Sequence, residues 1–246
     1  MLLRLNSVTK TFNGTSALAG VSFQVATNEI VGIIGPNGSG KTTIFNLVSR
    51  LISPDSGTLF LEDEDLLQLP AYMVARIGVA RIFQTPHLAS NLTVRQNVAV
   101  GAYMHDRWSW PLGIRMPLNA KVIECLGFLD LLDVKDEFPE RISYCDRRKT
   151  EVARALASSP KLLLLDEPTS GFSQAERDSL ARLILTIRDY GVTIILIEHD
   201  LSLIRRISNR VLVFDAGQKI AEGSPDVIAR DKAVTEIYLG RPYVAA

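Results

Sequence analysis

The 246-residue sequence is poor in the features that mark several large classes of protein. It has two cysteines, Cys125 and Cys145, too few for a disulfide scaffold and typical of a reducing compartment. Lys and Arg total 27, and Asp and Glu also total 27. With no excess of positive charge to attract nucleic acid or an anionic membrane surface, the composition predicts no nucleic-acid partner.

Long apolar runs are also missing. Residues 1–6 are interrupted by charged and polar side chains before the apolar region of a signal peptide could form. No stretch reaches the about 18 consecutive apolar residues of a membrane-spanning helix. From these absences we expect a cytoplasmic chain that works at a membrane only by docking on another protein.

The most informative stretch that is present is a glycine loop between a strand and a helix. An apolar run at 30–34 precedes the loop, and a helix-like run at 44–48 follows it. The two fixed glycines, the lysine and the threonine match the pattern of a phosphate-binding loop. The residues of this loop are Gly35, Pro36, Asn37, Gly38, Ser39, Gly40, Lys41, Thr42 and Thr43.

The chemistry of this loop follows from its residue types. Glycines let the backbone turn tightly so that several N–H groups point inward, and the start of the helix adds the positive end of its dipole. Lys41 is placed to reach the β- and γ-phosphates, and the Thr42 hydroxyl is placed to bind Mg²⁺. The loop therefore predicts a site for a nucleoside triphosphate.

Polar side chains follow three predicted core strands. Asp166 and Glu167 come directly after a run of four leucines, while Gln84 and His199 end two other buried strands. Asp166 is suited to hold Mg²⁺ through water, and Glu167 is suited to polarise the attacking water. Because the carboxyl ends of parallel strands meet at one edge of a sheet, we expect Gln84 and His199 to converge on the γ-phosphate.

The order of the patterns predicts an α/β protein. Residues 1–84 and 161–246 are expected to form a nucleotide-binding core, whose first 30 residues alternate as antiparallel strands do. Residues 85–160 are mainly helical, and the segment 105–117 within them is expected to be an irregular insert. The chain is thus expected to be one domain with a β subdomain and an inserted helical subdomain.

Capping patterns predict where two helices begin. Thr93 with Gln96 forms a capping box, and Ser143 with Asp146 is suited to cap a second helix. A last helix is expected over 226–238. Between these helices, apolar residues at helical spacing predict one buried helix face: Val122, Ile123, Leu126, Leu129 and Leu132.

Over essentially its whole length the sequence resembles the ATP-binding subunit of an ABC transporter. The resemblance implies a P-loop NTPase core with an antiparallel β subdomain and an inserted helical subdomain, and it implies ATP and Mg²⁺ as cofactors. It also implies that Gln84 joins Thr42 and Asp166 as a metal ligand. The matching motifs besides the phosphate loop are Phe83-Gln84, the strand from Leu162 to Glu167 with Pro168-Thr169, and Ile197-Glu198-His199-Asp200.

Within that family the sequence is most similar to the branched-chain amino acid uptake ATPases of the LivG type. Related members serve urea, short amides and lipopolysaccharide, so the resemblance leaves the substrate open. The similarity lies in the stretches 78–84, 142–144 and 219–240.

The family resemblance implies further sites and partners. It assigns Phe12 to stacking on adenine. A second ATPase subunit, identical or paralogous, would be contacted in trans by the signature motif, which is Ser143, Tyr144, Cys145 and Asp146. Transmembrane permease subunits and a periplasmic or extracellular solute-binding protein are the other expected partners, which places the chain on the inner face of the plasma membrane.

One residue departs from the family pattern. Cys145 stands where the family has a glycine, and a side chain there should obstruct the approach of backbone N–H groups to the γ-phosphate bound by the opposing subunit. We therefore hypothesise weakened ATP-driven dimerisation. A second hypothesis is that the helix dipole favours the Cys145 thiolate.

Two other functions compete with a transport ATPase. A soluble ABC protein acting on ribosomes or in DNA repair would carry two ATPase halves or long coiled-coil inserts, which this sequence lacks. A degenerate regulatory subunit would bind ATP with little hydrolysis, as Cys145 suggests, but Glu167 and His199 are both present and argue against it.

Overall fold

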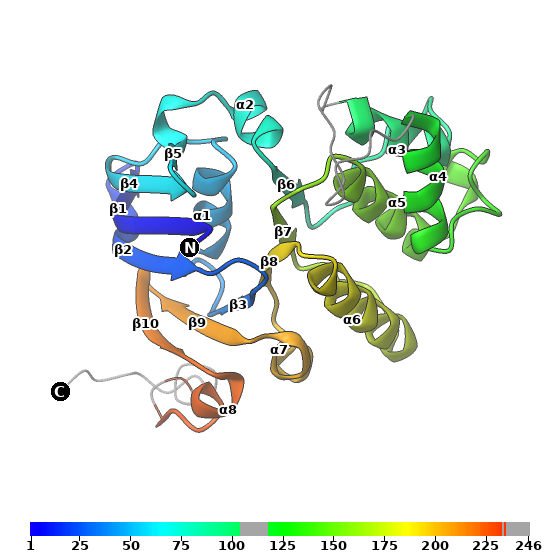
Figure 1. Cartoon of the computed structure of the whole chain (residues 1–246). Coiled ribbons are helices and arrows are strands. Elements are labelled where there is room, and N and C mark those ends of the chain that lie inside the picture. Colours follow the sequence, from blue (N-terminus) through cyan, green and yellow to red (C-terminus); the bar gives the residue numbers. More distant parts are fainter. Residues whose placement is uncertain (104–117, 233, 235–246) are drawn as a thin grey trace.

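The computed structural model describes residues 1–103, 118–232 and 234, and its strands form two sheets (Figure 1). One sheet has four strands in the order β2-β1-β4-β5, and all of its pairs are antiparallel. Its strands are β1 (Leu3–Phe12), β2 (Thr15–Val25), β4 (Ser56–Leu61) and β5 (Glu64–Asp65). The antiparallel strands expected in the first 30 residues are confirmed.

The second sheet has six strands in the order β10-β9-β3-β8-β7-β6. Its pairs are parallel except for the antiparallel hairpin of β9 and β10 at one edge. Its strands are β3 (Ile30–Ile34), β6 (Val79–Ile82), β7 (Leu162–Asp166), β8 (Thr193–Ile197), β9 (Arg210–Asp215) and β10 (Gln218–Gly223). Since five strands run the same way, the residues that follow β3, β6, β7 and β8 come out at one edge of the sheet.

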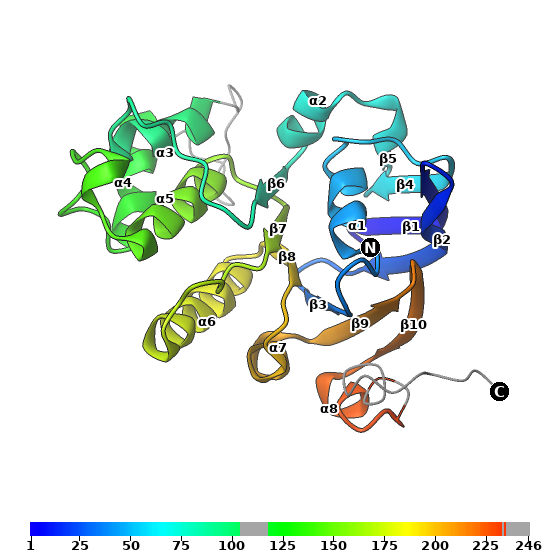
Figure 2. The ribbon, with the colours of Figure 1, turned by 180° about the vertical axis from the view of Figure 1, so that it is seen from behind.

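Helices surround this sheet and also form a separate lobe. Figures 1 and 2 show α3, α4 and α5 grouped together on the far side of β6 and β7 from the four-stranded sheet. The α-helices are α1 (Lys41–Val48), α2 (Ala71–Arg76), α3 (Val94–Tyr103), α4 (Leu118–Phe128), α5 (Tyr144–Ala157), α6 (Gln174–Asp189), α7 (Leu201–Ile207) and α8 (Pro225–Ile228). Short 3₁₀ turns lie at Leu66–Gln68 and Pro139–Arg141.

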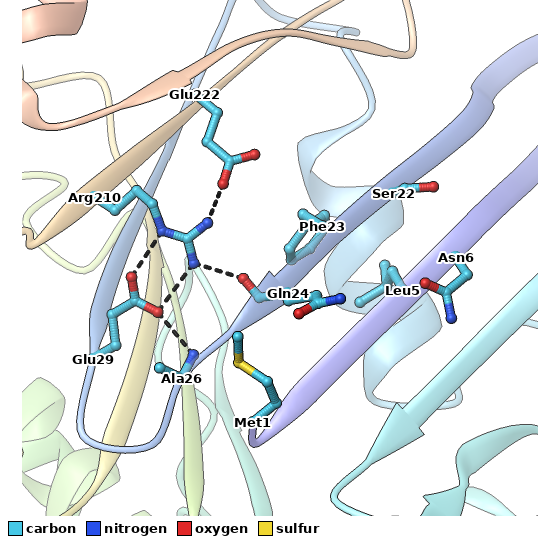
Figure 3. A pocket seen from close by; sticks show the side chains of 10 residues that line it. All are labelled: Met1, Leu5, Asn6, Ser22, Phe23, Gln24, Ala26, Glu29, Arg210 and Glu222. Carbon is cyan, nitrogen blue, oxygen red and sulfur yellow. Dashed lines mark hydrogen bonds and ion pairs between the residues drawn. The ribbon is translucent and has the colours of Figure 1, made fainter.

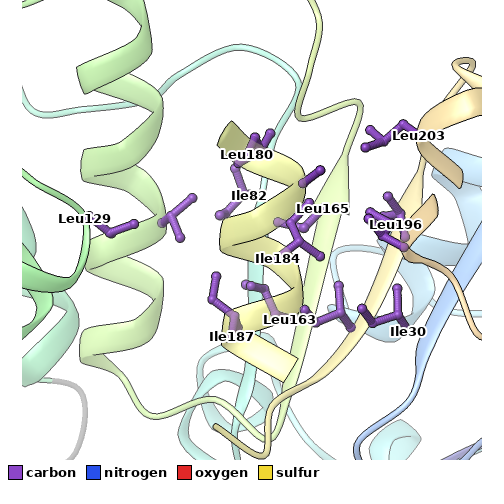
Figure 4. Close-up of a cluster of buried hydrophobic side chains, with 14 of the residues drawn as sticks. Ile30, Ile82, Leu129, Leu163, Leu165, Leu180, Ile184, Ile187, Leu196 and Leu203 are labelled. Atoms are coloured by element: carbon purple, nitrogen blue, oxygen red, sulfur yellow. The ribbon is translucent and has the colours of Figure 1, made fainter. Parts of the chain in front are cut away.

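The parallel strands are buried on both faces, which is why they are continuous apolar runs. Alternate residues of β7 enter different hydrophobic clusters: Leu163 and Leu165 join one cluster, and Leu162 and Leu164 join the other. The first cluster includes the apolar face of α6, where Leu180, Ile184 and Ile187 face the strands (Figure 4). The second includes α1 and the four-stranded sheet. The phosphate-loop helix is therefore sandwiched between the two sheets.

A polar junction joins β2 of the four-stranded sheet to β9 and β10 of the six-stranded sheet. A cavity of about 570 Å³ lies here, and Arg210 is the centre of the polar contacts that line it (Figure 3). Its guanidinium donates to Glu29 at 2.8 and 3.0 Å, to the Gln24 carbonyl at 2.6 Å, and to Glu222. These partners satisfy the charge of Arg210 and come from β2, from the residue before β3 and from β10, so the network fastens the β subdomain to the core.

Three sequence expectations need correction. Of the predicted helix face in α4, Ile123 and Leu132 are 41% and 42% exposed. Ile123 lies within the helix but beside the buried face that Val122 and Leu126 form, whereas Leu132 lies beyond the helix end at Phe128 and the turn at Asp130, whose φ is 55°. Leu131 is buried instead. Helical spacing cannot continue through a residue in the left-handed region.

The expected last helix is interrupted. The helix α8 ends at Ile228, and 229–231 form a turn and an irregular residue. The rest of the expected span lies largely outside the described residues, as does the insert predicted at 105–117. Helix α7 was not predicted at all. Asp200 caps α7 by accepting from the amides of Ser202 and Leu203, a signal hidden inside the histidine motif.

Across 1–103, 118–232 and 234, the structure contains no helix with both the length and the apolar character needed to span a bilayer.

Replacing the centre of the polar junction should destabilise the fold. Arg210→Met is expected to lower the free energy of unfolding by about 2 kcal/mol, because Glu29 would be left partly buried without its partner. Urea denaturation measures the effect. Arg188→Met is the matched control: Arg188 pairs with the exposed Asp189, and its loss should change stability by less than about 0.5 kcal/mol. Equal losses in the two variants would contradict a fastening role for Arg210.

Candidate functional site

The phosphate-binding loop follows β3 and begins α1, as the sequence predicts. Gly40 is the N-terminal cap of α1 with a φ of 99°, and a Cβ there would lie 2.5 Å from the Ala17 carbonyl oxygen. A Cβ at Gly35, whose φ is 151°, would lie 2.1 Å from the Phe214 carbonyl oxygen. Both positions therefore require glycine, and the loop is packed against β2 and β9.

The Lys41 side chain folds back onto the phosphate loop. Its ammonium donates to the carbonyls of Gly35 and Pro36, both at 2.8 Å, and only 6% of the residue is exposed. Burial lowers the pKa of Lys41, while Glu167 and Asp166 act to raise it. A buried cation bonded only to neutral carbonyls among the described residues is suited to an incoming anion, and the residues of the loop fit a polyphosphate.

Glu167 is held by the two residues expected beside it. Its Oε2 accepts from the Gln84 side chain at 2.7 Å, and its Oε1 lies 2.9 Å from His199 Nε2. The Glu167 backbone has a φ of 47°, and its amide donates to the Ile197 carbonyl at 2.9 Å. The structure thus brings Gln84, Glu167 and His199 together. The backbone of Glu167 has a conformation that is costly for a residue other than glycine.

Asp166 ends β7 and is paired with Arg81 of β6. Arg81 Nη2 donates to Asp166 Oδ2 at 2.9 Å, and both side chains are less than a tenth exposed. Burial raises the pKa of Asp166, although the hydrogen bond from Arg81 opposes the rise. Asp166 Oδ1 accepts no hydrogen bond from any residue that the structure describes.

The donors around the loop fit Mg²⁺ but do not form a complete cage. No group of three or more His, Cys, Asp or Glu side chains suited to a metal occurs within the described part of the chain. Asp166, the Thr42 hydroxyl and the Gln84 amide supply oxygen ligands of the kind that Mg²⁺ prefers. Mg²⁺ usually takes one or two protein ligands together with waters and substrate phosphates, which agrees with this sparse set.

Two buried groups near the site were missed by sequence reasoning. Glu198 is 4% exposed and accepts from the amide and hydroxyl of Thr169 at 3.0 and 2.7 Å. It therefore fixes the segment after Glu167 to the end of β8. The order Glu198-His199 at the end of a buried strand was a signal, because a buried carboxylate needs partners.

Arg148 of α5 was missed as well. Its guanidinium donates to the carbonyls of Phe83 and Gln84 and pairs with Glu151 at 3.0 Å. Both side chains are almost fully buried. The helix that begins at the predicted signature motif is thus bonded directly to the backbone that carries Gln84, a link across 64 residues that no local pattern reveals.

The predicted signature residues lie at the N-terminus of α5. Ser143 caps the helix, accepting from the Asp146 amide at 3.0 Å and donating to Asp146 Oδ2 at 2.7 Å. The Tyr144 ring packs edge-on against Phe172 with ring centroids 6.0 Å apart. The predicted cap is confirmed, and this helix end contacts the loop that follows Glu167.

Cys145 is half-buried in the first turn of α5. Burial raises the pKa of its thiol; Lys149 opposes this rise, whereas Glu176 and Asp146 add to it. This direction is opposite to the one expected if the helix dipole favoured the Cys145 thiolate, because desolvation penalises the charged form.

Phe12 ends β1, at the turn into β2. Its ring is 43% exposed, and the Lys10 ammonium lies 5.4 Å from the ring centroid. An exposed ring of this kind is available to a planar group.

Comparison with known proteins gives a consistent result. A family model described as "ABC transporter" matches residues 18–170, and a second, described as "Branched-chain amino acid ATP-binding cassette transporter", matches residues 218–244. The ATP-binding protein LivG for high-affinity branched-chain amino acid transport in Escherichia coli is 34% identical over 249 residues, covering 97% of this chain and 98% of LivG. BraF of Pseudomonas aeruginosa, with the same described role, is 32% identical with the same coverage.

Two further comparisons widen the range. LptB of Haemophilus influenzae, the ATP-binding protein of a lipopolysaccharide export system, is 30% identical and covers 98% of both chains. Among solved structures, an ATP-binding cassette of an ABC transporter in its ADP conformation has a TM-score of 0.87 at 29% identity, covering 98% of this chain and 99% of that one. The fold is thus shared along almost the whole chain.

The raised pKa of the Cys145 thiol predicts that Cys145 is alkylated slowly. The thiolate is the reactive form, so at pH 7 iodoacetamide should modify Cys145 more slowly than free cysteine, and the rate should rise with pH to a midpoint above that of free cysteine. Cys125, whose pKa is raised to about 11, should react more slowly still. Mass spectrometry of peptides from protein labelled across a pH series measures both rates. A Cys145 midpoint below that of free cysteine would restore the thiolate hypothesis.

Proposed function

Because the chain belongs to the ABC transporter family of ATP-binding subunits, we propose that it powers the uptake of branched-chain amino acids through separate membrane subunits. Members of this family bind and hydrolyse ATP, and this chain is an ATPase of that family. The observation that carries the proposed chemistry is the position of Glu167, held between Gln84 and His199 at the edge of the sheet where the phosphate loop also begins.

The roles of the site residues follow from their places. Lys41 and the amides of the loop 35–43 bind the phosphates, and Phe12 stacks on adenine. Thr42, Asp166 and Gln84 would hold Mg²⁺, which would supply charge neutralisation at the phosphates. Three residues would act on the γ-phosphate and its attacking water: Glu167, His199 and Gln84.

Glu167 acts as the base that orients and polarises the attacking water, and His199 keeps its carboxylate in place. In the structure Gln84 and His199 take both carboxylate oxygens of Glu167. Each carboxylate oxygen can accept more than one hydrogen bond, so Oε2 can take the water while Gln84 stays bound. Because Arg148 holds the Gln84 carbonyl, the position of Gln84 is coupled to α5.

We propose that the active form is a pair of such subunits, identical or paralogous. The signature residues Ser143, Tyr144, Cys145 and Asp146 lie at the N-terminus of α5, on the lobe of α3, α4 and α5 rather than on the core sheet. A helix N-terminus with a serine cap is suited to a γ-phosphate, and the partner subunit would bring that phosphate. A dimeric ATP-binding cassette with ADP and phosphate has the same fold, with a TM-score of 0.80 at 24% identity.

The membrane partners are inferred from the relatives. The named roles of LivG and BraF support transmembrane permease subunits and a periplasmic or extracellular solute-binding protein, and they support peripheral attachment on the inner face of the plasma membrane. The match of residues 218–244 to the branched-chain model favours amino acids over other cargo. Lipopolysaccharide export is the second candidate because LptB is 30% identical.

Reconstitution tests this proposal. The tagged chain, purified from membranes with its permease subunits, is placed in liposomes, and ATP-dependent uptake of labelled leucine is measured beside lipopolysaccharide release. Leucine uptake is expected, and Glu167→Gln should reduce both uptake and phosphate release about 10²-fold or more while ATP still binds. Glu176→Gln, which alters an exposed helix cap, is the matched control and should keep full activity. Lipopolysaccharide release without leucine uptake would overturn the assignment.

The residue at position 145 offers a second test. Cys145→Gly should raise the ATPase rate about fivefold, or about 1 kcal/mol, because removing the side chain opens the approach of the helix N-terminus to the partner's nucleotide. Cys145→Ala keeps a Cβ and should gain less. The rates are measured against subunit concentration, since the effect acts through dimerisation. An unchanged or lower rate for Cys145→Gly would show that the thiol does not obstruct the dimer.

A further inference from the structure

Arg81 has contacts that neither its strand nor the phosphate loop requires. It lies on β6, three residues before Gln84, and its side chain is 6% exposed. Nη2 donates to Asp166 Oδ2 at 2.9 Å, and Nη1 donates to Asn46 Oδ1 at 2.6 Å and to Ser49 Oγ at 3.3 Å. One guanidinium therefore bonds the end of β7 to α1 and its C-terminal cap.

Two aromatic rings also lie close to the same guanidinium. The Arg81 guanidinium carbon lies 4.5 Å from the centroid of the Phe83 ring and 5.5 Å from that of the Phe45 ring. Phe45 belongs to α1, and Phe83 directly precedes Gln84. A planar guanidinium stacks on aromatic rings while its edge donates, which the compact ammonium of lysine does not do.

Stability alone does not explain this arrangement. A buried ion pair contributes little net stability compared with apolar packing, since desolvation offsets the attraction. Arg81 also carries a buried Nε without a partner in the described residues. The elements that Arg81 joins are those that bear the predicted metal ligands: α1 begins with Lys41 and Thr42, β7 ends at Asp166, and β6 leads to Gln84.

We propose that Arg81 is a positioning residue for the metal-binding carboxylate of Asp166. By binding Oδ2 it sets the rotation of the carboxylate, so that Oδ1, which accepts no hydrogen bond from the described residues, is the oxygen offered to the metal's water. By binding Asn46 it holds Asp166 in register with the helix that carries Thr42. This inference rests on the proposed roles of Thr42 and Asp166 in binding Mg²⁺.

The test is the coupling between Mg²⁺ and nucleotide. Dissociation constants for a fluorescent, non-hydrolysable ATP analogue are measured in EDTA and in excess Mg²⁺. The constant in EDTA divided by the constant in Mg²⁺ gives the coupling without any catalytic turnover. In Arg81→Met the ratio is expected to fall about tenfold, the usual effect of losing a residue that orients a metal ligand. The constant in EDTA should stay within about twofold of wild type, because Arg81 does not touch the phosphate loop in the described contacts.

Two more variants test the role if Arg81→Met folds poorly. Arg81→Lys keeps the charge but loses the planar fork, so its coupling should lie between wild type and Arg81→Met. Asn46→Ala leaves Arg81 in place and removes its anchor on α1, and a smaller fall in coupling is expected. Arg210→Met is the matched control, since it removes an equally well bonded arginine at the junction of the sheets and should leave the coupling unchanged.

A double-mutant cycle separates positioning from a general structural effect. Asp166→Asn should itself lower the coupling, and adding Arg81→Met to it should cause no further fall, because Arg81 acts through that carboxylate. Additive losses, an unchanged coupling in Arg81→Met, or a stronger coupling that would make Arg81 a competitor of the metal would each overturn the inference. If wild type itself binds the analogue equally well with and without Mg²⁺, the proposed metal site fails instead.

Discussion

Parallel pairing of β3, β8, β7 and β6 is the constraint on which the rest of the structure depends. Each of these strands is followed by a residue or loop for which we propose phosphate, metal or proton chemistry, and parallel order brings all four ends to one edge of the sheet. The strands themselves are buried on both faces by α1 and the β subdomain on one side and by α6 on the other. Burial of the apolar runs therefore stabilises a sheet whose edge carries a polar, partly buried site.

Charges at this edge are stabilised by partners drawn from distant parts of the chain. Glu167 lies between Gln84 and His199, Asp166 is paired with Arg81, and Glu198 binds the segment after Glu167. These three carboxylates each have a polar partner on a different element, as desolvation demands. Such a network resists small displacements of one element without its neighbours, which suits a site that must hold several groups in fixed relation.

The lobe of α3, α4 and α5 contacts the core at the segments that follow β6 and β7. Arg148 on α5 binds the backbone of Phe83 and Gln84, and Tyr144 packs on Phe172 in the loop after Glu167. These contacts tie the position of α5 to both Gln84 and the loop after Glu167. A chain that turns ATP hydrolysis into motion of a membrane partner needs connections of this kind between its helical lobe and its nucleotide site.

Several features were determined by the sequence alone. The phosphate loop, the acidic pair after four leucines and the family resemblance are all local patterns, and they predicted the strand, loop and helix order and the convergence of Gln84 and His199 on one edge. Local patterns were less successful where the chain changes direction: the left-handed residue Asp130 ended the expected face of α4, and Asp200 began a helix inside a motif with another role.

Only the tertiary structure decided which side chains meet across large separations. Nothing in the spacing of Arg81, Arg148 or Glu198 reveals their partners, because Asp166 lies 85 residues from Arg81 and Gln84 lies 64 residues from Arg148. Burial likewise raises the pKa of Cys145 where the motif suggested a lowered one, since the cost of desolvation depends on neighbours that no short motif contains. The sequence determined the kind of chemistry through local patterns, whereas packing determined how each charged group is held.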